Sequence, residues 1–321
     1  MALRTVHFTY DQILWECHQT RRAQYFHLRL PCDDEDWAGN KGKRINIHNL
    51  RNPQTPDEGG ALKHMWNAIV HTYTTCRLTF SGDKLVAIGA IAARITAQTG
   101  DEYVAGLWRH DMPQNLAWTP MPYRGRLPPT YRSPSWSWAA IDGPVPTSVP
   151  YYVDDPRPLV AIDSCTIQSA TGSRFGPITG AELQLRGRLV PLWAYCESEL
   201  WVSDWRVHVG ADEPGREADF AQVARMMFCD VESPAGVRVA LSALPIYVSD
   251  LLDDPVVHCL VLQAVAGDNR GAFRRFGVWS FSAEEIRDLE SLKDLEDLVS
   301  RYKQGGEALD WPPSWENVVL V

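Results

Sequence analysis

The stretch from Asp101 to Pro158 constrains the fold more than any other, because prolines recur through it from Pro113 to Pro146. Proline lacks a backbone N–H, so it interrupts helices and the ladders of a sheet. Large rings stand among these prolines, at Trp118, Tyr123, Tyr131, Trp136 and Trp138. We therefore expect an irregular segment that is held together by packed rings rather than by regular backbone hydrogen bonds.

Two helices are predicted before this irregular centre. Apolar residues recur every three or four positions in the blocks Leu62–Cys76 and Leu85–Ile95. The second block is apolar on nearly all sides, which predicts a buried helix, and Gly100 marks its end.

After Pro158 the hydrophobic period becomes two, which is typical of half-buried strands. Leu183 and Leu185 alternate with polar residues, and we expect this strand to pair with the segment 159–168. Further strands are expected at residues 200–209, 226–231, 237–248, 258–266 and 273–281, the last two as a hairpin. A capping box at residues 282–285 predicts a final helix.

Together these patterns predict an α+β fold. We expect an N-terminal helical part with the aromatic-rich irregular centre over residues 1–158. This part should pack on a mostly antiparallel β-sheet or barrel-like region over residues 159–321, so that the two regions form one compact unit.

Charge and composition exclude several classes of protein. The chain carries 31 Lys and Arg against 40 Asp and Glu, and it has no basic block, so we expect no nucleic-acid partner. No apolar run is long enough to span a membrane, and the first residues lack the core of a signal peptide. The 7 scattered cysteines form no C-x-x-C pair, which favours free thiols and a cytoplasmic location.

Motifs for the common cofactors are missing from the sequence. Gly82–Lys84 lacks the spacing of a phosphate-binding P-loop, and no G-x-G-x-x-G follows an expected strand. The 9 histidines form no H-E-x-x-H motif and no zinc pattern with cysteines. We therefore expect neither a cofactor nor a metal.

The candidate site is the ring-rich centre together with the charged groups inside it. Its members are Trp108, Arg109, His110, Trp118, Tyr123, Arg132, Trp136, Trp138 and Asp142. In one interpretation the rings are the core of an irregular region, and Asp142 before Gly143 is a turn residue. In the other, part of the cluster lines an apolar cavity, where Arg, His or Asp groups orient the carbonyl or carboxylate of an apolar small molecule.

Four ordered blocks carry a family resemblance. Residues 133–143 read SPSWSWAAIDG, residues 4–17 include RTVHF and WEC, residues 66–92 include DKL, and residues 103–118 include AGLW. In this order they resemble the APSWSWAS-x-DG block, the end of the core, the DKL-x-AISGIA helices and the AGLW segment of the fungal heterokaryon-incompatibility (HET-domain) family. The TIR-like part that precedes these blocks in the family has no counterpart here, so we do not expect its cell-death signalling.

Three hypotheses for function follow. The favoured one, suggested by the resemblance, is a cofactor-independent small-molecule enzyme of fungal secondary metabolism. Such an enzyme would cyclise or isomerise an apolar polyene or terpenoid by holding two ends of one substrate in reach, in its sharpest form as an intramolecular Diels–Alder-type cyclase. The alternative is a non-enzymatic interaction or regulatory module of an incompatibility system. The third is an acyl-transfer or hydrolytic enzyme that uses Ser135, or Cys17 beside His18.

Overall fold

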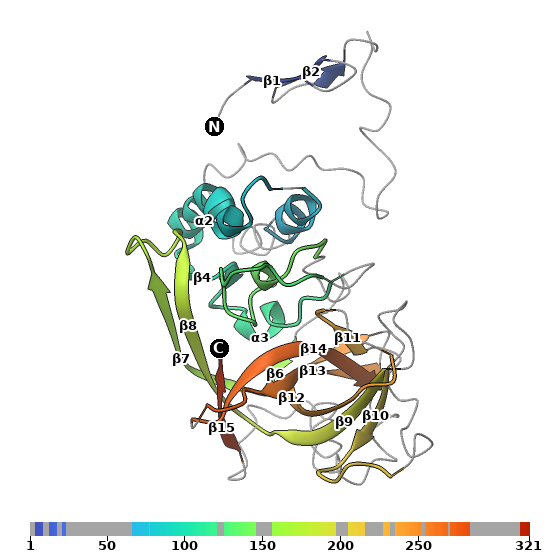
Figure 1. Ribbon diagram of the computed structural model, residues 1–321. Coiled ribbons are helices and arrows are strands. Elements are labelled where there is room, and N and C mark those ends of the chain that lie inside the picture. Colours follow the sequence, from blue (N-terminus) through green and yellow to red (C-terminus); the bar gives the residue numbers. More distant parts are fainter. Residues whose placement is uncertain are drawn as a thin grey trace. The chain divides into compact units, whose positions relative to one another are not determined.

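The computed structural model divides into two compact units, Met1–Met65 and Trp66–Val321 (Figure 1). In the first unit it describes the backbone of three short strands. In the second it describes residues 66–76, 78–120, 125–145, 156–196, 205–215, 227–231, 235–251, 254–268, 270–282 and 315–321. The second unit therefore contains both the helical part after residue 65 and the strand-rich region after residue 158.

The first unit contains a three-stranded antiparallel sheet in the order β1-β2-β3. β1 (Arg4–Phe8) pairs with β2 (Ile13–Cys17), and β3 (Arg21–Ala23) pairs with the other edge of β2.

The second unit begins with helical residues 66–74, followed by a 3-10 turn at Ser81–Asp83 and the helix α2 (Lys84–Thr99). α2 ends as predicted at Gly100, which has a φ of 71° and donates its N–H to the carbonyl of Thr96 at 2.9 Å.

The prediction that α2 is buried on nearly all sides is wrong. One face carries the buried residues Leu85, Ile88, Ala92 and Ile95, whereas the opposite face is exposed at Val86, Ala87 and Ala90. Apolar atoms make up much of the accessible surface of a folded protein, so apolar character alone overstated the burial. Among the described helices, none combines the length and apolar character that a bilayer crossing requires.

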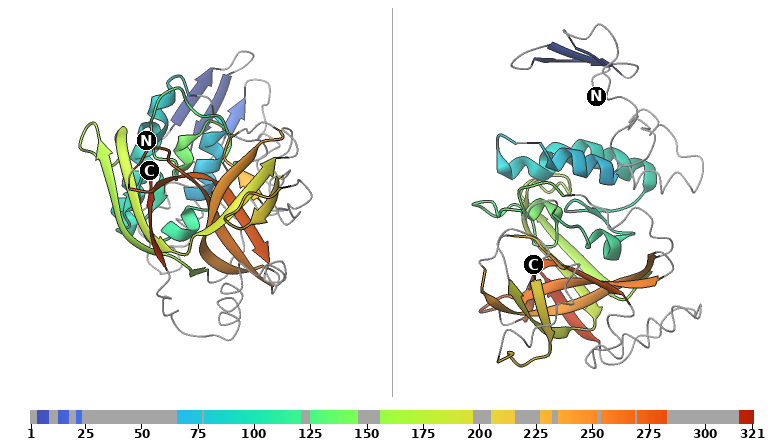
Figure 2. Two further views of the ribbon diagram at one scale, coloured as in Figure 1. Left: turned by 60° about the horizontal axis from the view of Figure 1, so that its bottom comes forward. Right: turned by 90° about the vertical axis from the view of Figure 1, so that its right-hand side faces the viewer.

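The centre of the unit is irregular, as predicted. Its regular elements are β4 (Tyr103–Val104), β5 (Leu107–Trp108), the one-turn helix α3 (Met112–Asn115) and a 3-10 turn at Trp138–Ala140. In Figures 1 and 2 this segment lies between α2 and the large sheet.

The region after residue 155 forms a ten-stranded sheet. Its strands are β6 (Arg157–Pro158), β7 (Ala161–Ser169), β8 (Ile178–Gly187), β9 (Val190–Cys196), β10 (Trp205–Val209), β11 (Met227–Cys229), β12 (Arg238–Leu251), β13 (Asp254–Ala264), β14 (Ala272–Ser282) and β15 (Glu316–Leu320). Eight of them follow the order β10-β9-β12-β13-β14-β15-β8-β7, while β11 pairs with β14 and β6 with β12. All pairs are antiparallel except β14 with β15.

The expected pairings of neighbouring strands are present, but the sheet is not a closed barrel. β7 pairs with β8, and β13 forms a hairpin with β14. Within the described residues the outer strands β10 and β7 have no ladder between them, so the sheet stays open. The predicted final helix after residue 282 lies outside the described residues.

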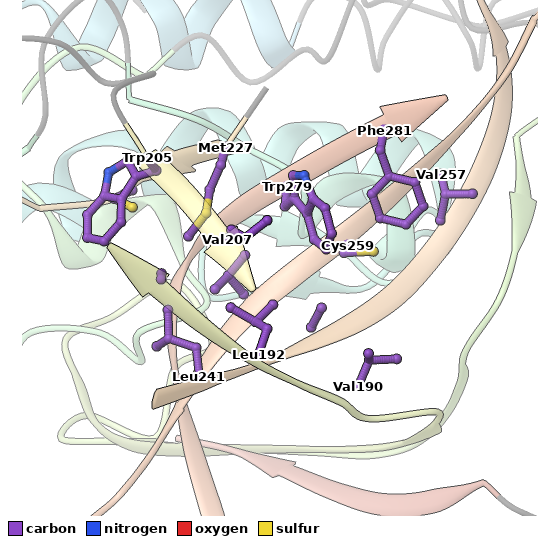
Figure 3. Close-up of a cluster of buried hydrophobic side chains, with 14 of the residues drawn as sticks. Val190, Leu192, Trp205, Val207, Met227, Leu241, Val257, Cys259, Trp279 and Phe281 are labelled. Atoms are coloured by element: carbon purple, nitrogen blue, oxygen red, sulfur yellow. The ribbon is translucent and has the colours of Figure 1, made fainter. Parts of the chain in front are cut away.

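One cluster of buried side chains fills the curve of the strands β9 to β14 (Figure 3). Trp205 and Met227 come from β10 and β11, and Trp279 and Phe281 come from β14. The rings of Trp279 and Phe281 lie 4.5 Å apart. Successive side chains along a strand point to opposite faces of the sheet. On β13, Cys259 and Val261 belong to the cluster, and Leu260 between them is also buried. Both faces of this central strand are therefore buried.

Candidate functional site

The turn between β4 and β5 organises the ring-rich centre. Ala105 and Gly106 both have positive φ, 49° and 97°, which is the backbone of a type I′ hairpin turn. The carbonyl of Gly106 accepts the indole N–H of Trp66 at 3.2 Å and that of Trp138 at 2.8 Å. A Cβ at Gly106 would lie 2.6 Å from Nε1 of Trp138, so this close approach requires glycine.

The four tryptophans of the predicted site are core residues. Trp108, Trp118, Trp136 and Trp138 are each at most 2% exposed. Trp108 meets Trp66 edge to face at 5.3 Å, and Trp118 donates its indole N–H to the carbonyl of Trp136 at 2.9 Å. Because protein surrounds each ring, these residues form packed core, and they do not line the pocket described below.

Two other members of the predicted site do not line that pocket, and a third lies outside the described residues. Arg109 is half-buried, and its Nη2 donates to the carbonyl of Ile162 at 3.4 Å. The side chain of His110 is 76% exposed. Tyr123 lies outside the described residues.

Arg132 and Asp142 form a polar network that the structure does bring together. Nη1 of the buried Arg132 lies 2.7 Å from Oδ1 of Asp142, whose side chain is half-exposed. The same guanidinium donates to the carbonyls of Ala139, Ile141 and Ser81 at 2.6, 2.7 and 3.2 Å. Each nitrogen of Arg132 therefore has a protein partner, and the residue acts by holding the backbone after Trp138 in place.

A pocket of about 370 Å³ opens beside this network. Its walls come from three segments: the end of the first helix, the start of α2 and the residues that follow the 3-10 turn at Trp138. The residues that line it include Tyr73, Cys76, Leu78, Lys84, Asp142 and Pro144. We call this hollow the Lys84 pocket, and Asp142 is the residue of the predicted site that lines it.

Lys84 lines this pocket and carries a buried amine. The residue is 4% exposed, its Nζ donates to the carbonyl of Ile141, and it lies 5.7 Å from the centre of the Trp138 ring. Burial, and then the positive charge of Arg132, lowers the pKa of Lys84 to about 7, although Asp142 acts in the opposite direction. Near neutral pH the amine is therefore populated in both its charged and its neutral form.

Tyr73 forms a fixed part of the same wall. Its hydroxyl donates to the backbone carbonyl of Lys84 at 2.7 Å, and its ring meets Trp138 edge to face at 6.2 Å. Burial raises the pKa of Tyr73 to about 12, so the hydroxyl keeps its proton at neutral pH. Tyr73 thus fixes the position at which α2 begins, and with it the position of Lys84.

Lys84 is not among the predicted site residues; in the sequence it belongs to the DKL block and to Gly82–Lys84, which lacks the spacing of a phosphate-binding loop. The sequence nevertheless contains a signal for Lys84. It is the first residue of the apolar helix α2 and lies four positions before Ile88 and eight before Ala92, on the helix face that is buried. A lysine on the buried face of a helix is uncommon, because burying its charge costs free energy.

A second polar cluster lies within the sheet. His258 hydrogen-bonds to the hydroxyls of Ser249, through Nε2 at 2.9 Å, and Ser280, through Nδ1 at 2.8 Å. All three residues are at most 5% exposed, and burial lowers the pKa of His258 to about 3. A neutral histidine with both nitrogens bonded and no opening to solvent is a structural group.

The hydrolytic hypothesis finds no site in the described residues. The Ser135 hydroxyl donates to the carbonyl of Val321 and accepts the N–H of Arg275 at 3.0 Å, so it is engaged by backbone and has no histidine partner. The side chains of Cys17 and His18 lie outside the described residues. In the part of the chain that the structure describes, no three His, Cys, Asp or Glu side chains stand close enough together to hold a metal ion.

Comparison with known proteins adds no assignment: no family model, no curated protein and no solved structure matches this chain.

Proposed function

We propose that the chain is a HET-like, cofactor-independent small-molecule enzyme of fungal secondary metabolism, and that its substrate occupies the Lys84 pocket. The observation that carries the proposal is a buried lysine of lowered pKa among the residues that line a pocket of about 370 Å³. Groups whose pKa is strongly shifted by burial and a neighbouring charge are typical of functional sites when they lie in a hollow. A volume of this size lies within the range of small-molecule sites.

The reaction that suits this pocket is a cyclisation or isomerisation of an apolar polyene or terpenoid that carries a carbonyl group. Leu78, Pro144 and the ring of Tyr73 supply apolar surface, while Lys84 supplies a hydrogen-bond donor. Holding the two ends of one substrate in reach lowers the entropic barrier of ring closure. A donor aimed at the substrate oxygen stabilises the charge that develops there. The sharpest form of the proposal is an intramolecular Diels–Alder-type cyclase.

The buried rings have a supporting role in this proposal. Trp138 lies against Lys84 and Tyr73, and its own position is fixed by the hydrogen bond to Gly106. A site whose side chains are locked by packing keeps its geometry during the reaction. The tryptophan cluster thus provides rigidity, and the substrate contacts come from the pocket wall.

The test is to delete the gene in its native host, profile small molecules, and restore the gene as wild type or variants. We expect a linear or uncyclised precursor to accumulate on deletion and to disappear with wild type. Lys84→Met should not restore the product, whereas Arg186→Met, on an exposed ion pair, should restore it. Thermal unfolding of both purified variants separates loss of activity from loss of fold.

An unchanged small-molecule profile after deletion would refute the enzyme proposal. If hyphal fusion behaviour changed at the same time, the interaction module of an incompatibility system would be the better account.

A further inference from the structure

We propose that Lys84 is a covalent catalytic residue, whose side-chain nitrogen forms an imine with a conjugated aldehyde or ketone held in the Lys84 pocket. This inference rests on the proposed function and names its substrate class. It requires a nucleophilic nitrogen, a fixed position for it, space for the carbonyl compound and a group that moves protons.

The position of the nitrogen is fixed from two sides. Nζ donates to the carbonyl of Ile141, and the ring of Trp138 lies 5.7 Å away. The Ile141 carbonyl is itself held by Arg132 at 2.7 Å. A neutral amine that donates one N–H to a carbonyl still has its lone pair, so this hydrogen bond orients the nucleophile without consuming it.

The charges around Lys84 favour the neutral amine. Within the described residues no carboxylate forms an ion pair with its nitrogen, because the carboxylate of Asp142 is bound to Arg132 at 2.7 Å. Arg132 adds a second positive charge nearby, and both burial and this charge lower the pKa of Lys84. Desolvation beside another cation is a known way for proteins to activate a lysine nucleophile.

The pocket supplies the remaining requirements. Its volume of about 370 Å³ admits a small carbonyl compound, and Asp142 lines it with a half-exposed carboxylate that can take up and return a proton. The neutral amine attacks the carbonyl carbon, a C–N bond forms, and the π electrons move to oxygen, which is protonated. Nitrogen then loses one proton, and the hydroxyl takes up one proton and leaves as water while the nitrogen lone pair forms the C=N bond. Loss of the last proton on nitrogen gives the neutral imine, so the net change is amine plus carbonyl giving imine plus water.

Such an imine would explain how this pocket accelerates a cyclisation without a cofactor. Once protonated, the C=N group draws electrons from a conjugated double bond more strongly than the parent carbonyl does. It therefore activates that bond as the electron-poor partner of a cycloaddition or for isomerisation. Hydrolysis of the imine returns Lys84 and releases the product.

The experiment is reductive trapping on the full chain. The protein is incubated with cinnamaldehyde and sodium cyanoborohydride near pH 7, and peptide mapping by mass spectrometry locates the reduced adduct. Because an ordinary lysine is almost fully protonated at this pH, we expect Lys84 to be labelled at least about tenfold faster than the other lysines of the chain. Its labelling should rise with pH to a midpoint near 7, as its pKa of about 7 requires.

Labelling of Lys84 no faster than that of the other lysines would overturn the inference. Lys84→Arg keeps a cation but removes the nucleophile. If this variant restores the product in the deletion strain, imine formation is refuted while the enzyme proposal stands. If deletion leaves the small-molecule profile unchanged, the enzyme proposal fails even where trapping at Lys84 succeeds.

Discussion

The guanidinium of Arg275 lies 3.5 Å from the centre of the Trp118 ring. Its Nε and Nη2 bond to the two carboxylate oxygens of Asp230 at 2.8 and 3.0 Å, and it donates to the carbonyls of Leu116 and Trp118. All these groups are buried. One side chain of β14 thus connects the irregular centre to the sheet through a stacked ring, a paired charge and two backbone carbonyls.

Arg275→Met should destabilise the protein by about 3–5 kcal/mol, because it leaves the Asp230 carboxylate buried without its partner. The measurement is the urea midpoint of unfolding. The control is Arg186→Met, which breaks the exposed pair with Asp163 and should leave the midpoint nearly unchanged. Equal small shifts for both variants would contradict the importance of the buried pair.

The β4–β5 turn predicts opposite effects at neighbouring positions. Gly106→Ala should destabilise by more than about 2 kcal/mol, because it adds a clash with Trp138 to the backbone cost of a positive φ. Ala105→Gly should stabilise by about 0.5–1 kcal/mol, because glycine adopts this φ without strain. Thermal unfolding measures both changes.

Gly172→Ala is the matched control for the turn, since Gly172 has a φ of 72° but open space around it. We expect it to cost only the backbone contribution of about 1–2 kcal/mol. If Gly172→Ala and Gly106→Ala shift the melting temperature equally, the close contact with Trp138 has no energetic importance.

The lowered pKa of Lys84 predicts a stability that rises with pH. Between about pH 7 and 10 the unfolded chain keeps the lysine proton while the folded chain has lost it, so raising the pH favours folding. Relative to Lys84→Met, the wild type should gain up to about 1.4 kcal/mol per pH unit from pH 7 to 9. A constant difference over this range would show that Lys84 keeps its ordinary pKa.

His258 predicts the corresponding effect in acid. Its folded pKa of about 3 lies below the usual 6.5, so between these values the unfolded state binds a proton that the folded state does not. Wild type should lose stability relative to His258→Gln as the pH falls from 6.5 toward 4, by up to about 1.4 kcal/mol per unit. Urea midpoints at several pH values test this, and parallel curves for the two proteins would refute it.

Much of the fold follows from local signals. The end of α2 could be predicted because the signal is local: Gly100 follows the last helical residue and adopts the left-handed conformation that caps the helix. The hairpin of β13 and β14 could be predicted because Gly267 and Gly271, both with positive φ, bracket its turn. The position of β15 could not, because its partners β14 and β8 are distant in the sequence and pairing over such distances leaves no local pattern.

The candidate site followed from sequence only in part. The sequence shows that tryptophan and tyrosine are concentrated in the irregular centre. Both a protein core and the lining of an apolar cavity are built from such rings, so only their packing in the structure distinguishes the two interpretations. The Lys84 pocket joins Tyr73, Lys84 and Asp142 from separate segments. The burial that alters Lys84 depends on Trp138, which no periodicity around Lys84 reveals.

The place of β15 between β14 and β8 has a consequence for biosynthesis. Among the described strands of its sheet the ribosome makes β15 last, so once β14 has been made the nascent chain carries the unfilled edges of β14 and β8 until β15 is delivered. Unpaired edges invite pairing with other chains. Yield during expression should therefore depend on how quickly the last strand is delivered, and on chaperones that shield the two edges until it arrives.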